Sequence, residues 1–71
     1  MPKRYSSRDV IGVIEKLGFL LVRQKGSHMI FRKKSGEVVV IVANKKELPP
    51  GTFSKILRDV HVTLEEFQSL L

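Results

Sequence analysis

The sequence predicts a small α+β domain, in which a three-stranded antiparallel meander carries helices on one face. Three observations predict this fold. Apolar residues first recur at the spacing of a one-sided helix, then occur in three short runs separated by turn residues, and finally return to helical spacing. Short turns join strands that run antiparallel, and helices on one sheet face complete a core. We therefore expect the order α-β-β-β-α-α in one domain over residues 1–71.

The first helix is expected over about residues 7–17. Ser6 and Asp9 have the spacing of a capping box at its start. The apolar positions that follow recur every three or four residues: Val10, Val13, Ile14 and Leu17. Gly18 then provides a left-handed C-cap, which ends the helix.

Three strands are predicted, over Phe19–Gln24, His28–Lys33 and Val38–Ala43. The turns between them are Lys25–Ser27, where Gly26 can supply a positive φ, and Lys34–Glu37. The third strand is apolar at every position. We therefore expect it to be central in the sheet or covered on both faces.

Two further helices close the chain. Asn44–Gly51 is expected to be a loop, because Pro49 and Pro50 exclude helix just before them and shape the entry to the next element. The second helix is lined on one side by Phe53, Ile56, Leu57 and Val60. Thr63–Glu66 is a second capping box, which opens a short terminal helix.

The charge of the chain is positive and unevenly distributed. The net charge is +6, and eleven of the thirteen Lys and Arg residues lie within residues 1–46, which hold three acids. This bias favours a polyanionic partner, nucleic acid above all, although a basic surface also keeps a small protein in solution. The absence of cysteine favours a cytoplasmic location. The longest apolar run, Val38–Ala43, is far too short to span a bilayer, so no membrane partner is expected.

Strand alternation predicts which way His28 points. His28, Ile30 and Arg32 share one face of the second strand, and Met29 and Phe31 share the other. Burying Met29 and Phe31 removes more apolar surface from water. Burying the first face would trap a histidine and an arginine without evident acidic partners. We predict that Met29 and Phe31 face the helices and that His28 lies on the open face.

An imidazole in that position could act on a bound phosphodiester, because it gives or takes a proton near neutral pH. Lys25 and Arg32 would supply positive charge at the same rim, and Gly26 would leave room for a ligand backbone. This set suits attack of an RNA 2′-hydroxyl on its own phosphate. By spacing alone, however, the simpler interpretation is favoured, in which His28 is an exposed strand residue without a catalytic role.

The other polar residues that could have a function are expected to bind a ligand or to stabilise the fold. Lys45 and Lys46 follow the third strand, where they could track phosphates or form a solvated loop. His61 falls near the end of the second helix, where a cationic histidine interacts favourably with the helix dipole. The acidic residues are scattered, so neither a metal site nor a cofactor is expected.

Three segments carry a family resemblance. They are the first helix followed by LGFLLVRQKGSHMIF, the hydrophobic third strand, and KELPPGTFSKILRD followed by TLEEFQSLL. In these segments the chain resembles the HicA family, the toxin half of HicA–HicB toxin–antitoxin pairs. The resemblance implies a fold like the double-stranded-RNA-binding domain and a metal-independent endoribonuclease that cleaves mRNA, an mRNA interferase. It assigns the essential histidine to His28, framed by Gly26 and Ser27, and implies a HicB-like antitoxin that covers the active face.

The chain also departs from the family pattern. Relatives often carry a second histidine where this chain has Met29, and many have a Pro-x-His segment where it has Ile41–Ala43. Three functions therefore follow from the sequence. The first is an RNA endonuclease toxin, with His28 as general acid or base, Lys25 and Arg32 at the phosphate, and Ser27, Lys45 and Lys46 positioning the RNA. The second is a non-catalytic RNA-binding module of the same fold. The third is a basic face that docks an acidic protein.

Overall fold

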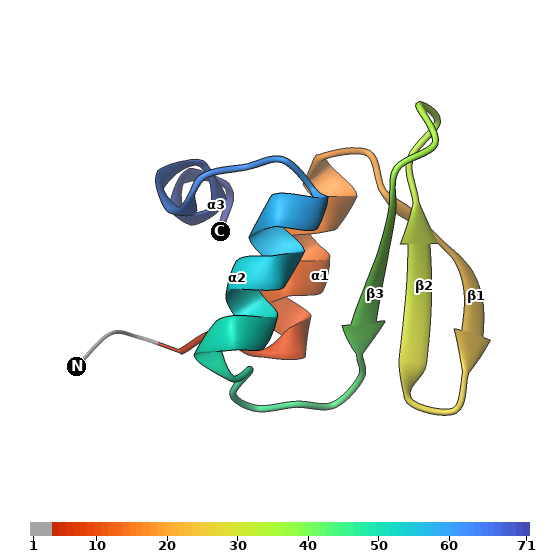
Figure 1. Ribbon diagram of the computed structural model, residues 1–71, viewed down its shortest axis with the longest axis horizontal. Helices are drawn as coiled ribbons and strands as arrows, with labels where there is room; N and C mark the ends of the chain where they lie inside the picture. Colours follow the sequence, from red (N-terminus) through yellow and green to blue (C-terminus); the bar gives the residue numbers. More distant parts are fainter. Residues whose placement is uncertain (1–3) are drawn as a thin grey trace.

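The computed structural model describes residues 4–71, which form three helices and one three-stranded antiparallel sheet. The elements are α1 (Ser7–Lys16), β1 (Leu20–Lys25), β2 (His28–Arg32), β3 (Val38–Val42), α2 (Pro50–Asp59) and α3 (Leu64–Leu70). The sheet order is β1-β2-β3, so the predicted α+β meander is confirmed. Figure 1 shows the helices on one side of the sheet, with β3 nearest to them and β1 farthest away.

The predicted capping boxes at the starts of α1 and α3 are confirmed, whereas α2 begins at Pro50, inside the segment Asn44–Gly51 that was expected to be a loop. Ser6 and Asp9 form a reciprocal capping box at α1, and Thr63 and Glu66 form one at α3. Each box satisfies backbone N–H groups that a helix start leaves without partners. Gly18 has a φ of 99°, the left-handed conformation expected where α1 stops.

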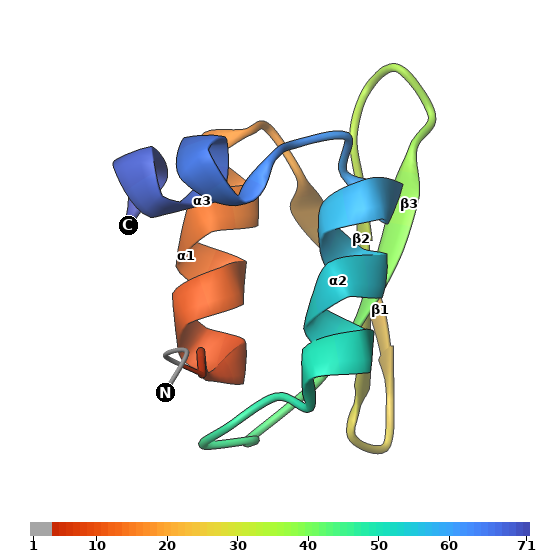
Figure 2. The ribbon, with the colours of Figure 1, turned by 60° about the vertical axis from the view of Figure 1, so that its left-hand side comes forward.

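The core lies between the sheet and the helices (Figure 2). The sheet contributes Phe31, Val39 and Ile41, each with at most 1% of its surface exposed. Met29 is half-buried and packs against this cluster, so the prediction that Met29 and Phe31 face the helices is confirmed. A group of three aromatic rings, Tyr5, Phe53 and Phe67, joins the N-terminal segment to α2 and α3, with ring centroids 4.9–5.1 Å apart.

The prediction that the third strand is central or covered on both faces is wrong. β3 is an edge strand, and its burial alternates along the chain. Val39 and Ile41 are buried under the helices, whereas Val38 and Val40 remain 50% and 46% exposed. The apolar run gave the wrong prediction because it lacks the alternating polar residues that normally indicate a solvent-exposed face.

β1 extends beyond the helices. All six of its residues are exposed, including apolar Leu20, Leu21 and Val22. Its register with β2 shifts between Leu21 and Arg23, which places a β-bulge at Val22. β1 is therefore held chiefly by its pairing with β2.

Ser7 ties the start of α1 to the end of β3. Its buried hydroxyl donates a hydrogen bond to the Val42 carbonyl (2.5 Å) and accepts one from the Lys45 N–H (3.1 Å). The Ser7 N–H donates to the Lys45 carbonyl (2.9 Å). These bonds fix the segment after β3 against α1.

Candidate functional site

The face of the sheet that the helices leave uncovered, here called the open face, consists of three cross-strand rows. The rows are Lys25–His28–Val42, Arg23–Ile30–Val40 and Leu20–Arg32–Val38. Residues in register on neighbouring strands point to the same side of a sheet, which defines these rows. His28 is exposed at the start of β2, on the side opposite to the buried Phe31, as predicted.

The hairpin turn brings Lys25 directly opposite His28. Directly paired residues in an antiparallel sheet have Cβ atoms about 4.5–5.5 Å apart. Gly26 and Ser27 form the turn, with Gly26 at a φ of 59°. A Cβ added at Gly26 would meet nothing within 4 Å, so the approach over the turn is open.

Ser27 contributes its backbone to this geometry. Its carbonyl accepts a hydrogen bond from the Ala43 N–H at 2.6 Å, which continues the β2–β3 pairing past His28. The His28 end of β2 is thus held from both sides, by Lys25 on β1 and by the end of β3.

Arg23 is the cation that the sequence interpretation missed. It pairs with Ile30, two residues along from His28, and is therefore a diagonal neighbour of His28 on the open face. The signal was present in the sequence. Once a two-residue turn pairs Lys25 with His28, alternation places Arg23 on the same face as Lys25.

The expectation that Arg32 shares a rim with Lys25 is wrong. Arg32 lies on the open face but at the opposite end of β2, four residues from His28, a separation of roughly 13 Å at strand spacing. There it lines a hollow of about 520 Å³, together with Leu20, Val22, Lys33 and Lys34.

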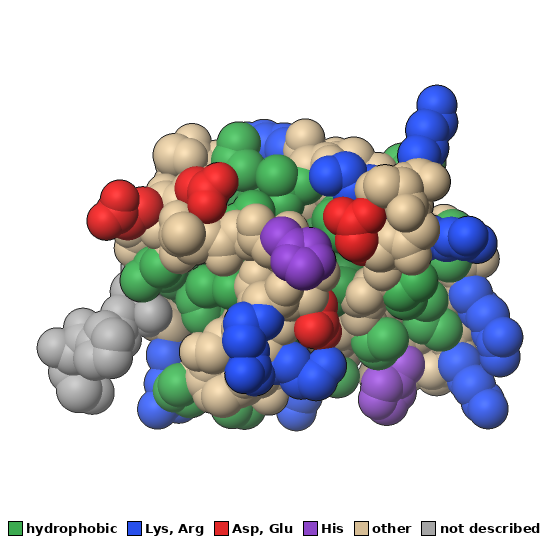
Figure 3. Space-filling view, turned by 45° about the horizontal axis from the view of Figure 1, so that its top comes forward, with side chains coloured by type: hydrophobic (Ala, Val, Ile, Leu, Met, Phe, Trp, Pro, Cys, Tyr) green, Lys and Arg blue, Asp and Glu red, His purple; other side chains and the backbone are tan. Residues whose placement is uncertain are grey.

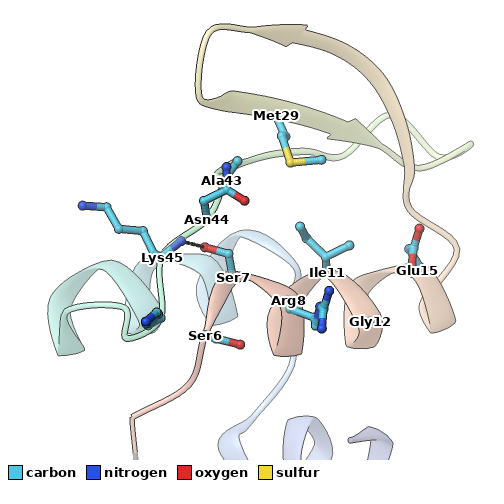
Figure 4. A pocket seen from close by; sticks show the side chains of 11 residues that line it. Ser6, Ser7, Arg8, Ile11, Gly12, Glu15, Met29, Ala43, Asn44 and Lys45 are labelled. Carbon is cyan, nitrogen blue, oxygen red and sulfur yellow. Dashed lines mark hydrogen bonds between the residues drawn. The ribbon is translucent and has the colours of Figure 1, made fainter.

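Lys45 and Lys46 lie on the helix side of the sheet. They border a hollow of about 770 Å³ between α1 and the β1–β2 hairpin, here called the α1 groove (Figure 4). The groove is lined by Ser6, Ser7, Arg8, Ile11, Gly12, Glu15, Met29, Ala43, Asn44, Lys45 and Lys46. The two lysines are thus grouped with Arg8 rather than with His28.

The open-face cations are not neutralised within the described chain. Across residues 4–71 the only salt bridge joins Lys55 to Asp59 on α2, at 3.0 Å. Arg23, Lys25 and Arg32 have no carboxylate partner there, so their charge is available to an anionic ligand. Figure 3 shows Lys and Arg side chains in blue along the side of the molecule where the sheet lies.

His61 lies apart from this site, and Figure 3 shows the two histidines as separate purple patches. It follows α2 with a φ of 59°, the left-handed conformation of a helix-ending residue. Its charged neighbour is Glu37, whose carboxylate accepts a hydrogen bond from the Ser35 hydroxyl. That bond lowers the pKa of Glu37 below its ordinary value, and Lys33 and His61 lower it further.

Among residues 4–71, no three His, Asp or Glu side chains gather where they could hold a metal ion. None of the helices in this part of the chain is long and apolar enough to cross a membrane.

The sequence matches a family model over residues 7–62, described as the HicA toxin of bacterial toxin–antitoxin. The chain belongs to the HicA family. The match runs from the first residue of α1 to just past α2, so it includes the whole sheet with His28 and ends before α3. No curated protein matches the chain.

Membership of the HicA family makes this protein a toxin of a toxin–antitoxin system, with an antitoxin as its partner. The open face of this HicA toxin combines two features. It carries an exposed histidine beside uncompensated cations, and it exposes the apolar side chains of Leu20, Val38 and Val40.

Proposed function

We propose that this HicA toxin is an endoribonuclease that cleaves mRNA, with His28 as its catalytic residue. The observation that carries the proposal is the pairing of His28 with Lys25 on an exposed sheet face. The imidazole is accessible to a ligand as large as an RNA strand, and a cation stands at its side.

The reaction that suits this arrangement is transfer of the phosphoryl group within the RNA strand. The 2′-oxygen forms a bond to the adjacent phosphorus, the bond to the 5′-oxygen of the next nucleotide breaks, and a 2′,3′-cyclic phosphate remains. A base takes the 2′-hydroxyl proton, and an acid gives a proton to the leaving 5′-oxygen. His28 serves one of these transfers, a role that contributes about 10²–10⁴-fold to a rate, and a lysine, a water molecule or an oxygen of the substrate serves the other.

The cations stabilise the charge that grows on the phosphoryl oxygens. Lys25 and Arg23 are the cationic neighbours of His28 in the register of the sheet, and they hold the phosphate of the cleaved bond. Arg32 lies farther along β2 and contacts a more distant phosphate. Gly26 admits the strand over the turn, and Ser27 positions it next to His28.

A HicB-like antitoxin neutralises the toxin by covering the open face. Val38, Val40 and Leu20 are 46–67% exposed there, and Ile30 lies beside Val40 in the middle row of this face. Large exposed apolar patches with polar neighbours are typical of protein-binding sites. The toxin acts in the cytoplasm, where its mRNA substrate is found.

The test compares native protein with His28→Ala in growing cells. Expression of the native chain should arrest growth and degrade mRNA, whereas His28→Ala should do neither while remaining folded. His61→Ala is the matched control, because it removes the other histidine and should remain toxic. If His28→Ala still arrests growth and cleaves RNA, the assignment of catalysis to His28 fails.

A second function, RNA binding without cleavage, is favoured by one observation. The row that contains His28 ends in Val42, so no second imidazole accompanies it. This alternative predicts salt-sensitive binding and intact RNA after long incubation with purified protein. Cleavage that co-purifies with the native chain and is absent from His28→Ala excludes it.

A further inference from the structure

The α1 groove lies on the opposite side of the sheet from His28, and both apolar and charged side chains line it. Figure 4 shows Met29 and Ile11 facing one another across it. Three cations, Arg8, Lys45 and Lys46, border the groove, and Glu15 is the only carboxylate in its lining. The hollow therefore combines an apolar slot with a positively charged border.

Gly12 lies in the wall of this groove, in the middle of α1. A glycine inside a helix destabilises it relative to alanine. The fold does not require the glycine, because its φ is not positive and an added Cβ would meet nothing within 4 Å. The missing side chain leaves the groove wider at this point.

The groove opens at the same end of the sheet as the candidate catalytic residue. Met29 follows His28 in the chain and points to the other side of the sheet. Figure 1 shows the β1–β2 turn and the connection from β3 to α2 at this same end. The space above Gly26, where an added Cβ would meet nothing within 4 Å, is the route by which a strand at His28 would reach the groove.

We propose that the α1 groove holds one nucleobase of the bound RNA strand, close in the strand to the phosphodiester at His28. This inference rests on the proposed RNA substrate. The base lies between Ile11 and Met29, where its flat faces are removed from water. Its neighbouring phosphates lie near Arg8, Lys45 and Lys46. The strand must be single there, because a base can enter such a slot only when it is unstacked and unpaired.

Substitutions at Gly12 test the proposal. Binding of a short, labelled single-stranded oligoribonucleotide is measured by fluorescence anisotropy, with all proteins carrying His28→Ala so that the RNA stays intact. Gly12→Gln places a flexible side chain in the groove wall and should weaken binding about tenfold, equivalent to about 1.4 kcal/mol. Gly12→Ala should weaken it less. Both should raise the melting temperature, by roughly 4 °C, because the helix improves.

Gly51→Gln is the matched control. Gly51 is also a helical glycine whose added Cβ would meet nothing within 4 Å, but it lies on α2 and outside the groove. RNA affinity should be unchanged in this variant. An equal loss of affinity in Gly51→Gln and Gly12→Gln would overturn the proposal.

A series of oligoribonucleotides that each lack one nucleobase tests whether the groove binds a base. Removal of the base at one position should weaken binding to the protein that retains Gly12. With that oligonucleotide, the protein with Gly12 and the Gly12→Gln variant should bind with equal affinity. A difference that persists with every oligonucleotide would overturn the proposal, as would normal RNA binding by Gly12→Gln. If Gly12→Gln binds RNA normally but no longer binds the antitoxin, the groove binds a protein partner and the proposal is refuted.

The inference and the proposed function can fail separately. If the native chain cleaves no RNA but the Gly12 dependence is found, the groove holds a base and the nuclease proposal fails. If the native chain cleaves RNA and Gly12→Gln binds and cleaves with unchanged efficiency, only the groove proposal fails.

Discussion

Lys25 and His28 are direct partners across the β1–β2 hairpin, on the sheet face that the helices leave open. The pairing follows from a turn of only two residues, Gly26 and Ser27. The cation and the imidazole are therefore positioned by backbone pairing rather than by side-chain packing. The same register makes Arg23 the next cation along this face.

Arg23→Gln should reduce RNA cleavage more than Arg32→Gln. Arg23 is diagonal to His28, whereas Arg32 lies at the far end of β2. Removing a group that stabilises the developing charge at the cleaved phosphate should lower kcat/KM by about 10²-fold. Removing a distant phosphate contact should mainly raise KM. Steady-state cleavage of one defined oligoribonucleotide measures both, and the reverse order of effects would refute this placement.

His61→Gly should stabilise the protein. The His61 backbone has a φ of 59°, a conformation that costs a residue with a Cβ about 1–2 kcal/mol and costs glycine little. The free energy of unfolding in urea should rise by about 1 kcal/mol. Asn44, at a φ of 61°, is the control, because asparagine tolerates this conformation and Asn44→Gly should gain less. A loss of stability in His61→Gly would mean that its side chain contributes more than its backbone costs.

Ser7→Ala should destabilise the fold by about 1–3 kcal/mol, because it leaves the partly buried Lys45 N–H and Val42 carbonyl without the hydroxyl partner. Urea denaturation gives this difference directly. Ser54→Ala, at an exposed position on α2, should change stability by less than about 0.5 kcal/mol. Equal effects of the two substitutions would show that the Ser7 hydrogen bonds contribute nothing.

Ser35→Ala should raise the pKa of Glu37 toward its ordinary value, because the Ser35 hydroxyl is the main cause of its lowering. NMR titration of the Glu37 carboxyl measures this, with Ser54→Ala as a control that should leave the titration unchanged. A lowered pKa favours the folded state above the pKa of the unfolded chain. That contribution is lost as the pH falls through the folded pKa. Glu37→Gln should therefore remove part of the acid sensitivity of folding, and an unchanged acid transition would contradict the assignment.

Local signals in the sequence predicted most of the fold. The capping boxes at Ser6 and Thr63 and the turn at Gly26 each depend on residues close in the chain, so their chemistry is visible without tertiary structure. The position of β3 was mispredicted because a continuous apolar run does not reveal that Val38 and Val40 lie on the face of the sheet that the helices leave uncovered.

The candidate site was predictable in part. Alternation along β2 placed His28 on the open face, and the same rule applied to β1 would have identified Arg23. The α1 groove could not be predicted, because it brings together residues as distant as Arg8, Met29 and Lys45. Which cations share a cavity depends on how α1 packs against the sheet, and no local pattern encodes that packing.

The exposure of β1 has a consequence for motion. A strand with no layer on either side opens locally at a lower free-energy cost than strands covered on one face, and its amide protons should exchange with solvent earlier than those of β2. Lys25 and Arg23 thus belong to a strand that can change its shape more easily than β2 while the core stays folded. Binding of a partner to this hairpin would order it, and protection of the β1 amides would report that event.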